Sequence, residues 1–505
     1  MPYIDGLSLG STVAAAAVTA SVWLVVLAAY RLFLGPLARF PGPKLAALTG
    51  WYETYYDCWR RGSYWVEVEQ MHQKYGPIVR ISPWELHVDD PDWNEAYKVS
   101  SRLNKYYWYY RFVGSSDAAF GTADHDVHRI RRKAQQTYFT LDSVARFDNE
   151  LDRITSKLVS RLQEFKGTDQ PANLSNAFRC LATDVVTEFA FDKSYNLLDS
   201  PDFAAAFQRT LRDFPEIGLW HRHFGLILNI LDLMPRWLTK IINPAGIDVV
   251  DFMTDIGART DRLVNDYKKN TDPDERSNII HQMLDSTTLP AADKLNWRLA
   301  LEMRTLVGAG TETTGATLTA ITYHILTRPE KVNRLVAEIT EAQMKRQTPL
   351  KYQELQQLPY LNAVVLEGLR IATPVAGRLP RINTREAMVY KSFSIPKSTP
   401  VSTTQRLTHF NPSIYASPDI FLPERWLVSP AERKNLEKYL QPFGRGSRSC
   451  LGIHLAYSEI YVTVAKLFGN FKLQLFDTDF DDIKQVHDFF SPFPESDKGL
   501  RVTVL

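Results

Sequence analysis

A single cysteine in a glycine-rich loop is the residue of this chain best suited to hold a metal. Cys450 lies in the segment FGRGSRSCLG, residues 443–452, and the other two cysteines, Cys58 and Cys180, lie far upstream. A tetrahedral zinc site needs several ligands, which this loop does not supply. One thiolate suits the axial position of a metal that another group already holds, such as haem iron.

The residues around Cys450 favour a ligand. Gly446 and Gly452 allow backbone geometry that a Cβ would block, so the loop can curl beneath a flat cofactor. Free backbone N–H groups in such a loop can stabilise a thiolate. Arg448 can pair with an anionic group of the cofactor, and Phe443 can pack near the sulfur and limit water access. The alternative is a buried, inert cysteine after a turn, which is the common state of a free thiol.

A second candidate lies inside an apolar run, residues 299–326, that contains no proline. Its segment AGTETT, residues 309–314, places one glycine and three threonines in a predicted helix, where they are poor helix formers. Threonine hydroxyls can bond back to the preceding turn and bend the helix, which would open space for dioxygen. Glu312 and Thr313 would then supply an acid and an alcohol for relaying protons. The alternative, a polar stripe on a solvated helix, fits poorly with the apolar neighbours Met303, Leu306 and Leu318.

Two pairs of residues have helical spacing. Glu367 and Arg370 are three residues apart, and His128 and Arg132 are four apart, so each pair shares one face of a helix. Taken alone, each pair could equally be two exposed residues on the surface of a helix, which contribute little to stability. Their meaning depends on the other motifs.

Together these motifs resemble those of the cytochrome P450 family, in the family's order and over nearly the whole chain. Residues 443–452 match every fixed position of Phe-x-x-Gly-x-Arg-x-Cys-x-Gly. Residues 309–314 resemble the oxygen-activating segment Ala/Gly-Gly-x-Asp/Glu-Thr-Thr/Ser, with Glu where many members have Asp. Glu367 and Arg370 match Glu-x-x-Arg, and the segment PERW, residues 423–426, is similar to the later Pro-Glu-Arg-Phe-like segment.

The resemblance implies a haem b cofactor (iron protoporphyrin IX) with Cys450 as its thiolate ligand. It implies that Arg425 joins Glu367 and Arg370 in a buried network that holds the ligand loop, and Trp426 replaces the frequent Phe. Contacts to the haem propionates are also implied. The residues at those positions are Arg378, Arg132 and His128, the last in place of the family's Trp.

The pattern of elements predicts a mostly α chain with a smaller β part, which is the P450 fold. Residues 75–81 are typical of a turn that enters a strand, and residues 86–88 are expected to pair with it. Helical patterns dominate from residue 125 to about residue 340 and return at 361–370 and 453–468. Prolines and β-branched residues between 374 and 423, and the end of the chain from 471, indicate short strands and coil.

Composition narrows the class of protein further. The chain has 505 residues, 45% of them hydrophobic, with a formal net charge of +2, so it can build a large core and lacks the charge of a nucleic-acid-binding surface. Three cysteines do not make a disulfide framework, which indicates a reducing compartment. No linker-like stretch divides the chain, and we expect an anchor at 1–34 and one haem domain at 35–505.

One stretch, residues 13–34, is long and apolar enough to span a bilayer. Asp5 precedes it and Arg31, Arg39 and Lys44 follow, so the positive-inside rule places the body in the cytosol. Together with the family resemblance, the anchor suggests the endoplasmic-reticulum membrane. A cleaved signal peptide is the rival reading, but no positive charge precedes this long run. Prolines at 36, 41 and 43 form a stiff joint behind it.

The resemblance implies a membrane-anchored monooxygenase that inserts one oxygen atom of O2 into an apolar small molecule. NADPH–cytochrome P450 reductase would supply the electrons, because no flavin or nicotinamide domain fits in the chain. Aromatic and apolar residues at 106–112, at Phe120 and at 217–237 would form a lid over the haem.

Segments 123–129 and 375–381 are similar to those of fungal trichodiene-oxygenase-like enzymes, which suggests terpenoids ahead of polyketides or alkaloids. Two alternatives stay open. One is a haem isomerase or dehydratase that uses neither O2 nor NADPH, and the other is a haem sensor without catalysis.

Overall fold

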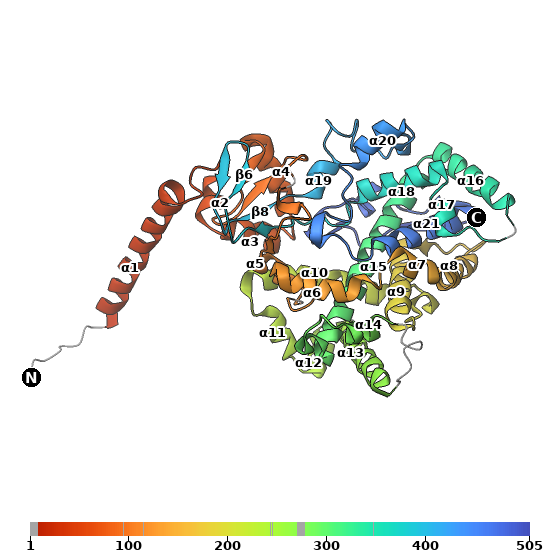
Figure 1. Ribbon diagram of the computed structural model, residues 1–505, viewed down its shortest axis with the longest axis horizontal. Helices are drawn as coiled ribbons and strands as arrows, with labels where there is room; N and C mark the ends of the chain where they lie inside the picture. The colour runs from red at the N-terminus through yellow and green to blue at the C-terminus, as the bar shows by residue number, and fades with distance from the viewer. Residues whose placement is uncertain are drawn as a thin grey trace, which may run out of the picture.

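The structure is a computed structural model that describes residues 9–93, 95–114, 116–242, 244, 246–269, 278–346 and 348–505. The chain enters as α1 (Leu9–Ala29), continues as one π-helical turn (Tyr30–Leu34), and projects away from the body (Figure 1). Residues Thr12–Leu34 form one helical stretch long and apolar enough to cross a membrane, and none of it is buried. This is the stretch that the sequence predicts as the anchor.

The body is mostly helical, as predicted. Its longest helix, α15 (Asn296–Leu326), runs without interruption through the threonine-rich segment, and Pro329 begins the next helix, α16. The remaining helices are α2 (Lys44–Leu48), α3 (Trp51–Thr54), α4 (Tyr64–Tyr75), α5 (Tyr107–Tyr110), α6 (His125–Gln136), α7 (Leu141–Arg146), α8 (Asp148–Gln163), α9 (Leu174–Phe191), α10 (Ala205–Phe224), α11 (Ile227–Asp232), α12 (Arg236–Ile242), α13 (Gly246–Lys269), α14 (Ile279–Asp285), α16 (Pro329–Met344), α17 (Tyr352–Leu355), α18 (Pro359–Ala372), α19 (Gln405–His409), α20 (Pro430–Glu437) and α21 (Ile453–Asn470).

Glycines let the helices around α15 approach it closely. A Cβ added at Gly310 would lie 2.9 Å from Val186 of α9, and one at Gly368 of α18 would lie 2.1 Å from Ile321. Both distances are shorter than side chains tolerate, so glycine at these positions sets how near α9 and α18 pack to α15. The main hydrophobic core lies around these helices and includes α21, the helix that follows Cys450.

The strands form small sheets: β6 and β8 lie near the end of the body that carries α1, whereas β12 directly precedes the C-terminus at the opposite end (Figure 1). Five of them pair in the order β1-β2-β8-β5-β3, with Ile78 opposite Val88 as the sequence predicts. The described strands are β1 (Ile78–Arg80), β2 (Leu86–Val88), β3 (Asn104–Lys105), β4 (Ala172–Asn173), β5 (Arg381–Ile382), β6 (Met388–Tyr390), β7 (Phe393–Ile395), β8 (Pro400–Ser402), β9 (Leu473–Leu475), β10 (His487–Phe489), β11 (Ser491–Phe493) and β12 (Arg501–Val504).

Candidate functional site

The Cys450 loop has the tight curl that its glycines predict. The backbone N–H of Cys450 donates to the carbonyl oxygen of Phe443 at 2.8 Å. Gly446 has φ +72°, and a Cβ there would lie 2.3 Å from the carbonyl oxygen of Tyr97, so only glycine fits. Cys450 is exposed, whereas Cys58 and Cys180 are buried. The loop therefore presents one accessible thiol directly before α21.

The surroundings of the Cys450 sulfur set its charge. Although the residue is accessible from one side, desolvation by the protein packed around the sulfur raises the pKa of the Cys450 thiol above its ordinary value, while the backbone N–H of Gly452 and the charge of Arg132 act in the opposite direction. The net effect favours the neutral thiol, so the thiolate needs a further positive charge beside it. A bound metal cation supplies that charge and deprotonates a coordinating thiol.

Four cations from four separate elements lie close together beside this loop. They are Lys105 of β3, Arg132 of α6, Arg381 of β5 and Arg448. Burial first, and then the charges of the other three, lower the pKa of Lys105, and burial followed by the charges of Arg381 and Arg132 lowers that of Arg448. The pKa of Arg448 falls to about 9 and that of Lys105 falls well below its usual value. Among the described residues their hydrogen bonds go to backbone carbonyls and one hydroxyl, never to a carboxylate. We call these four residues the cationic group.

His128 lies beside the cationic group and lacks a hydrogen-bond partner. Its side chain is buried, and its Nδ1 is unpaired, as is Nε of Arg448. Burial first, and then the charge of Arg448 and of its neighbours, lower the pKa of His128 to about 2. The ring is therefore neutral at physiological pH, and one of its nitrogens carries a hydrogen that can be donated to an anion.

The chemistry of these donors fits haem. Unpaired buried cations are costly, and two propionate carboxylates would pair with them. The thiol of Cys450 fits the iron on the same cofactor. Arg132 also connects the two features, because its guanidinium donates to the carbonyl oxygen of Ser449 at 2.6 Å.

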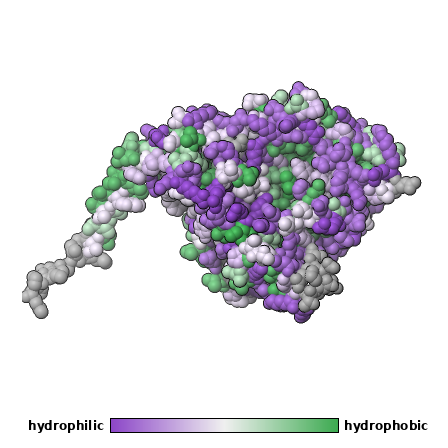
Figure 2. Space-filling model, viewed as in Figure 1, coloured by the Kyte–Doolittle hydropathy of each residue, from purple (hydrophilic) through white to green (hydrophobic). Residues whose placement is uncertain are grey.

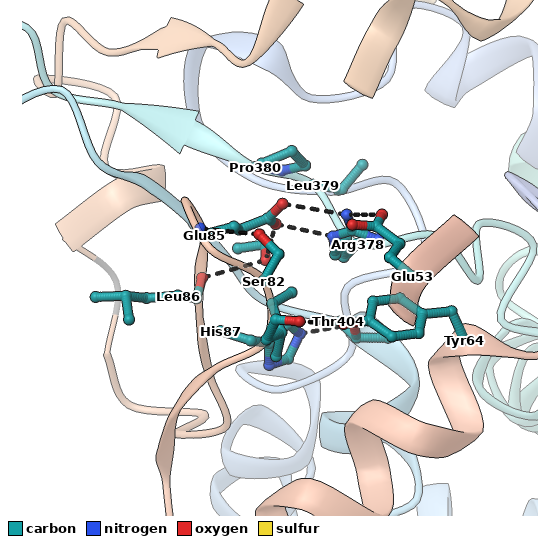
Figure 3. A network of polar contacts seen from close by, with 12 residues as sticks. Glu53, Tyr64, Ser82, Glu85, Leu86, His87, Arg378, Leu379, Pro380 and Thr404 are labelled. Atoms are coloured by element: carbon teal, nitrogen blue, oxygen red, sulfur yellow. Dashed lines mark hydrogen bonds and ion pairs between the residues drawn. The ribbon is translucent and has the colours of Figure 1, made fainter. Parts of the chain in front are cut away.

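The structure does not bring Arg378 into the cationic group. Its guanidinium is held by two buried carboxylates, Glu85 at 2.8 Å and Glu53, as Figure 3 shows. Burial alone would lower the pKa of Arg378, but the two carboxylates raise it well above its usual value. With its charge already paired, Arg378 has little capacity for a propionate, whereas Arg381, three residues further on, belongs to the cationic group.

The acid and the alcohol lie on α15 as predicted. The Thr313 hydroxyl donates back to the carbonyl oxygen of Ala309 at 2.9 Å, and Ala309 is exposed although the helix around it is largely buried. Glu312 forms a two-bond ion pair with Arg179 of α9, at 2.7 and 2.8 Å. Arg179 in turn lines a polar cavity of about 170 Å³ between α9, α10 and the C-terminal strands. The roles of Glu312 and Thr313 in proton transfer remain predictions.

Glu367 is the centre of a buried ionic network. Its carboxylate accepts two bonds from Arg370, at 2.8 and 3.0 Å, and two from Arg425, both at 3.1 Å. Trp426 adds a bond from Nε1 at 3.0 Å, which a phenylalanine could not make. Arg370 continues to the carbonyl oxygen of His409, whose ring accepts from the backbone N–H of Gln441, two residues before the Cys450 loop begins. The predicted connection between the network and the loop thus has a continuous path.

Sequence patterns did not point to Lys105 or Arg381 as members of the site. A single lysine in a two-residue strand matches no motif. Arg381 was not selected because Arg378, in the same segment, was predicted to be the propionate contact. The signal that could have distinguished the two arginines was a pair of acidic residues, Glu53 in α3 and Glu85 directly before β2. Two buried carboxylates need a cation of their own, and once Arg378 supplies it, Arg381 is the arginine left for the cofactor.

Comparisons with known proteins agree on one family. The family model for cytochrome P450 matches residues 48–495. The chain is 37% identical to a cytochrome P450 monooxygenase of Ascocoryne sarcoides, covering 94% of this chain and 95% of that protein. It is also 37% identical to a tryptophan 6-hydroxylase of Fusarium equiseti, covering 95% and 94%. A stellatic acid synthase of Emericella variicolor is 35% identical, covering 96% and 93%.

Proposed function

Because this chain belongs to the cytochrome P450 family and its relatives are fungal monooxygenases, we propose that it oxygenates an apolar small molecule of secondary metabolism. The observation that carries the proposal is one accessible thiol, Cys450, beside four cations, two buried and two half-buried, that form no bond to a carboxylate of the described residues. Membership of the family implies a haem-thiolate cofactor, and the four cations support haem b with its two propionates. When bound, haem supplies the redox chemistry that activates O2, and its thiolate ligand favours O–O cleavage.

The residues of this chain bind and shield that cofactor. Cys450 would ligate the iron, and Arg132, Arg381, Arg448 and Lys105 would bind the propionates, with His128 as a neutral donor. Phe443 packs against Tyr457 with ring centroids 4.9 Å apart. That contact supports its predicted role of limiting water near the sulfur.

Thr313 and Glu312 would bring protons to the oxygen side of the site. The Thr313 hydroxyl is already oriented by its bond to Ala309 and keeps acceptor lone pairs for a second partner. Glu312 can exchange protons with solvent only if its carboxylate shares or leaves Arg179, whose other side faces the polar cavity. In this proposal Glu312 would relay protons from the cavity to Thr313.

Thr313→Ala is expected to separate electron use from product formation. Haem content, the carbon-monoxide spectrum and substrate affinity should persist, because the change removes only a hydroxyl and a methyl group. Product per NADPH should fall by up to about a hundredfold, the low end of what a positioned proton donor contributes, and hydrogen peroxide should rise to compensate. The measurement counts NADPH, peroxide and product in one reaction with NADPH–cytochrome P450 reductase.

Thr317→Ala is the matched control for that experiment. Its hydroxyl makes the same back-bond one turn later, to the carbonyl oxygen of Thr313, at 2.8 Å. Coupling should be retained in this control. Unchanged coupling in Thr313→Ala would remove Thr313 from the mechanism, and wild-type turnover without NADPH would favour the haem isomerase or dehydratase.

The membrane anchor and the domain division are part of the proposal. We propose that residues 1–34 anchor the protein in the endoplasmic-reticulum membrane and that residues 35–505 form the cytosolic haem domain. The apolar surface of α1 supports this (Figure 2). Exposed apolar side chains on α2–α3, the turn after α3 and α11–α12 would face the same lipid. They are Leu45, Trp51, Tyr55, Trp59, Leu226, Ile230, Leu233, Trp237, Ile241 and Ile242.

Deletion of residues 1–34 should release most of the protein from carbonate-washed microsomes. A helix of this length and apolarity is sufficient to span the bilayer, and none of it is buried in the body. It is hydrogen-bonded to the body at Arg31, in its last turn, whose carbonyl oxygen accepts from Arg80 at 2.6 Å. Haem content should be preserved, and the exposed apolar side chains are expected to retain a minor fraction. Complete retention of the shortened protein would contradict a single dominant anchor.

The substrate is best approached through the metabolites of a deletion strain. According to their names, the relatives act in the chemistry of different molecules. One hydroxylates tryptophan, and another forms stellatic acid. We propose a terpenoid first, from the similarity of segments 123–129 and 375–381 to trichodiene-oxygenase-like enzymes. A compound that accumulates in the deletion strain and is oxygenated by microsomes carrying this protein would identify the substrate.

A further inference from the structure

The 117–124 segment, which leads into α6, is held almost entirely through its backbone. Six of its backbone groups and one side chain are bound by charged residues from four different elements, and none of those bonds is made by a neighbour in sequence. Ala118 and Ala119 are buried, and Thr122 is 5% exposed. A loop fixed in this way has one position set by the charged residues rather than by its own sequence.

On one side the segment is bound by the cationic group. The Nζ of Lys105 donates to the carbonyl oxygen of Phe120 at 2.5 Å. Arg448 donates to the carbonyl oxygens of Thr122 at 2.6 Å and Ala123 at 3.0 Å. The segment thus lies against the residues that would bind the haem propionates.

On the other side the segment is bound by two residues that belong to no known motif of the chain. The carboxylate of Glu302 on α15 accepts from the backbone N–H of Ala119 at 2.7 Å. Arg131 on α6 donates to the carbonyl oxygen of Asp117 at 2.8 Å and to the hydroxyl of Thr122 at 2.7 Å. Both contacts are charge-assisted, which makes them stronger than ordinary backbone bonds.

Glu302 and Arg131 are themselves fixed by a buried ion cluster, which we define as Arg131, Asp293, Arg298 and Glu302. Arg298 donates to Glu302 at 2.6 Å, and both side chains are 2% exposed. Asp293 lies between Arg298, at 3.2 Å, and Arg131, at 2.8 Å. Two positive and two negative charges balance within the cluster, so neutralising Glu302 leaves an uncompensated charge on Arg298 in the interior.

The segment carries an aromatic side chain toward the predicted lid. The ring of Phe120 lies 5.4 Å from that of Phe490, between centroids, and 5.9 Å from that of Tyr110. Phe490 stands at the turn between β10 and β11 with φ +81°, so two irregular segments meet here through their aromatic rings. Displacement of the 117–124 segment would move Phe120 away from this contact.

We propose that Glu302 is a positioning residue for substrate specificity: with Arg298 and Arg131, it holds the 117–124 segment in place. The segment then presents Phe120 as a rigid wall of the pocket beside the haem. A rigid pocket wall raises the affinity for ligands large enough to contact it and hardly changes the affinity for ligands that do not reach it. This role rests on the proposed haem site, because the cationic group fixes the other side of the same segment.

The test uses the full-length holoenzyme in lipid nanodiscs and the variant Glu302→Gln. Hydrogen–deuterium exchange of the 117–124 segment should accelerate by about tenfold or more, while exchange in α9 and α18 stays unchanged. Binding of two azoles to the haem is measured on the same samples. The dissociation constant of 4-phenylimidazole should rise by about fivefold, and that of imidazole, which is too small to need the wall, should stay within about twofold.

Two further variants make the result decisive. Asp126→Asn removes a carboxylate from an exposed pair with Arg102 at the start of α6 and should change neither measurement. Arg131→Lys keeps the charge, but a single ammonium cannot bind Asp293, as Nε and Nη2 do, and also donate to Asp117 and Thr122, as Nη1 does. It should therefore reproduce the faster exchange if Glu302→Gln fails to fold.

Unchanged exchange in the 117–124 segment, or faster exchange with an unchanged ratio of the two azole constants, would overturn the inference. Faster exchange throughout the chain in both variants would also overturn it, because the cluster would then support only the fold. A wild-type protein without haem would instead contradict the proposed function, while the exchange experiment would still report on the segment.

Discussion

Cys450→Ser is expected to abolish the red-shifted carbon-monoxide band that a thiolate-bound ferrous haem gives. Serine has nearly the same size as cysteine, so the loop should keep its shape. The hydrogen bond from the backbone N–H of residue 450 to the carbonyl oxygen of Phe443 should also persist. A hydroxyl is a far weaker acid than a thiol and does not provide a comparable anionic ligand. The measurement is the difference spectrum of purified, folded protein, combined with its haem content.

Cys180→Ser is the control for the same chemical change at a buried position. Its sulfur lies 3.2 Å from the carbonyl oxygen of Phe203 and accepts from Gln208, and a hydroxyl can replace both contacts. Burial raises the pKa of the Cys180 thiol to about 12, so it stays neutral and inert. The band should survive in this control. Its survival in Cys450→Ser would mean that Cys450 is not the ligand.

Glu367→Ala is expected to give mostly haem-free, poorly folded protein. Arg370 and Glu367 are fully buried, and removal of the carboxylate leaves Arg370 and Arg425 without their anion. Breaking a buried ion pair in this way costs about 3–5 kcal/mol. The Cys450 loop should also lose its fixed position, because Arg370 is connected to it through the hydrogen bonds of His409 and Gln441. Haem content and the midpoint of thermal unfolding measure both effects.

Two graded variants accompany it. Trp426→Phe removes only the bond from Nε1 to Glu367 and should cost about 2 kcal/mol, with haem retained. Glu341→Ala breaks an exposed pair with Lys345 of similar helical spacing and should change nothing measurable. If Glu367→Ala behaved like Glu341→Ala, with normal haem content and stability, the network would have no part in forming the cofactor site.

Local sequence was sufficient to predict the tight turn of the Cys450 loop, because its glycines and its cysteine lie within residues 443–452. The positive φ of Gly446 requires glycine, and the role of Cys450 as the metal ligand remains a prediction. The long helix α15 and the first strand pair were predictable for a similar reason, since apolar runs and turn residues act over a few positions. The Glu-x-x-Arg pair was visible as a pattern, although its burial was not.

The partners of charged residues were decided only by tertiary structure. Arg378 and Arg381 stand in one short segment, and no local pattern separates them, yet Arg378 faces Glu53 and Glu85 whereas Arg381 joins Lys105, Arg132 and Arg448. Glu302 and Ala119 are likewise far apart in the chain and meet only because α15 packs beside the 117–124 segment. In a low-dielectric interior a charge is paired by the opposite charge that lies nearest in space. The folded chain brings carboxylates to some of its buried cations, and the cations without a carboxylate are the ones left for an anionic cofactor.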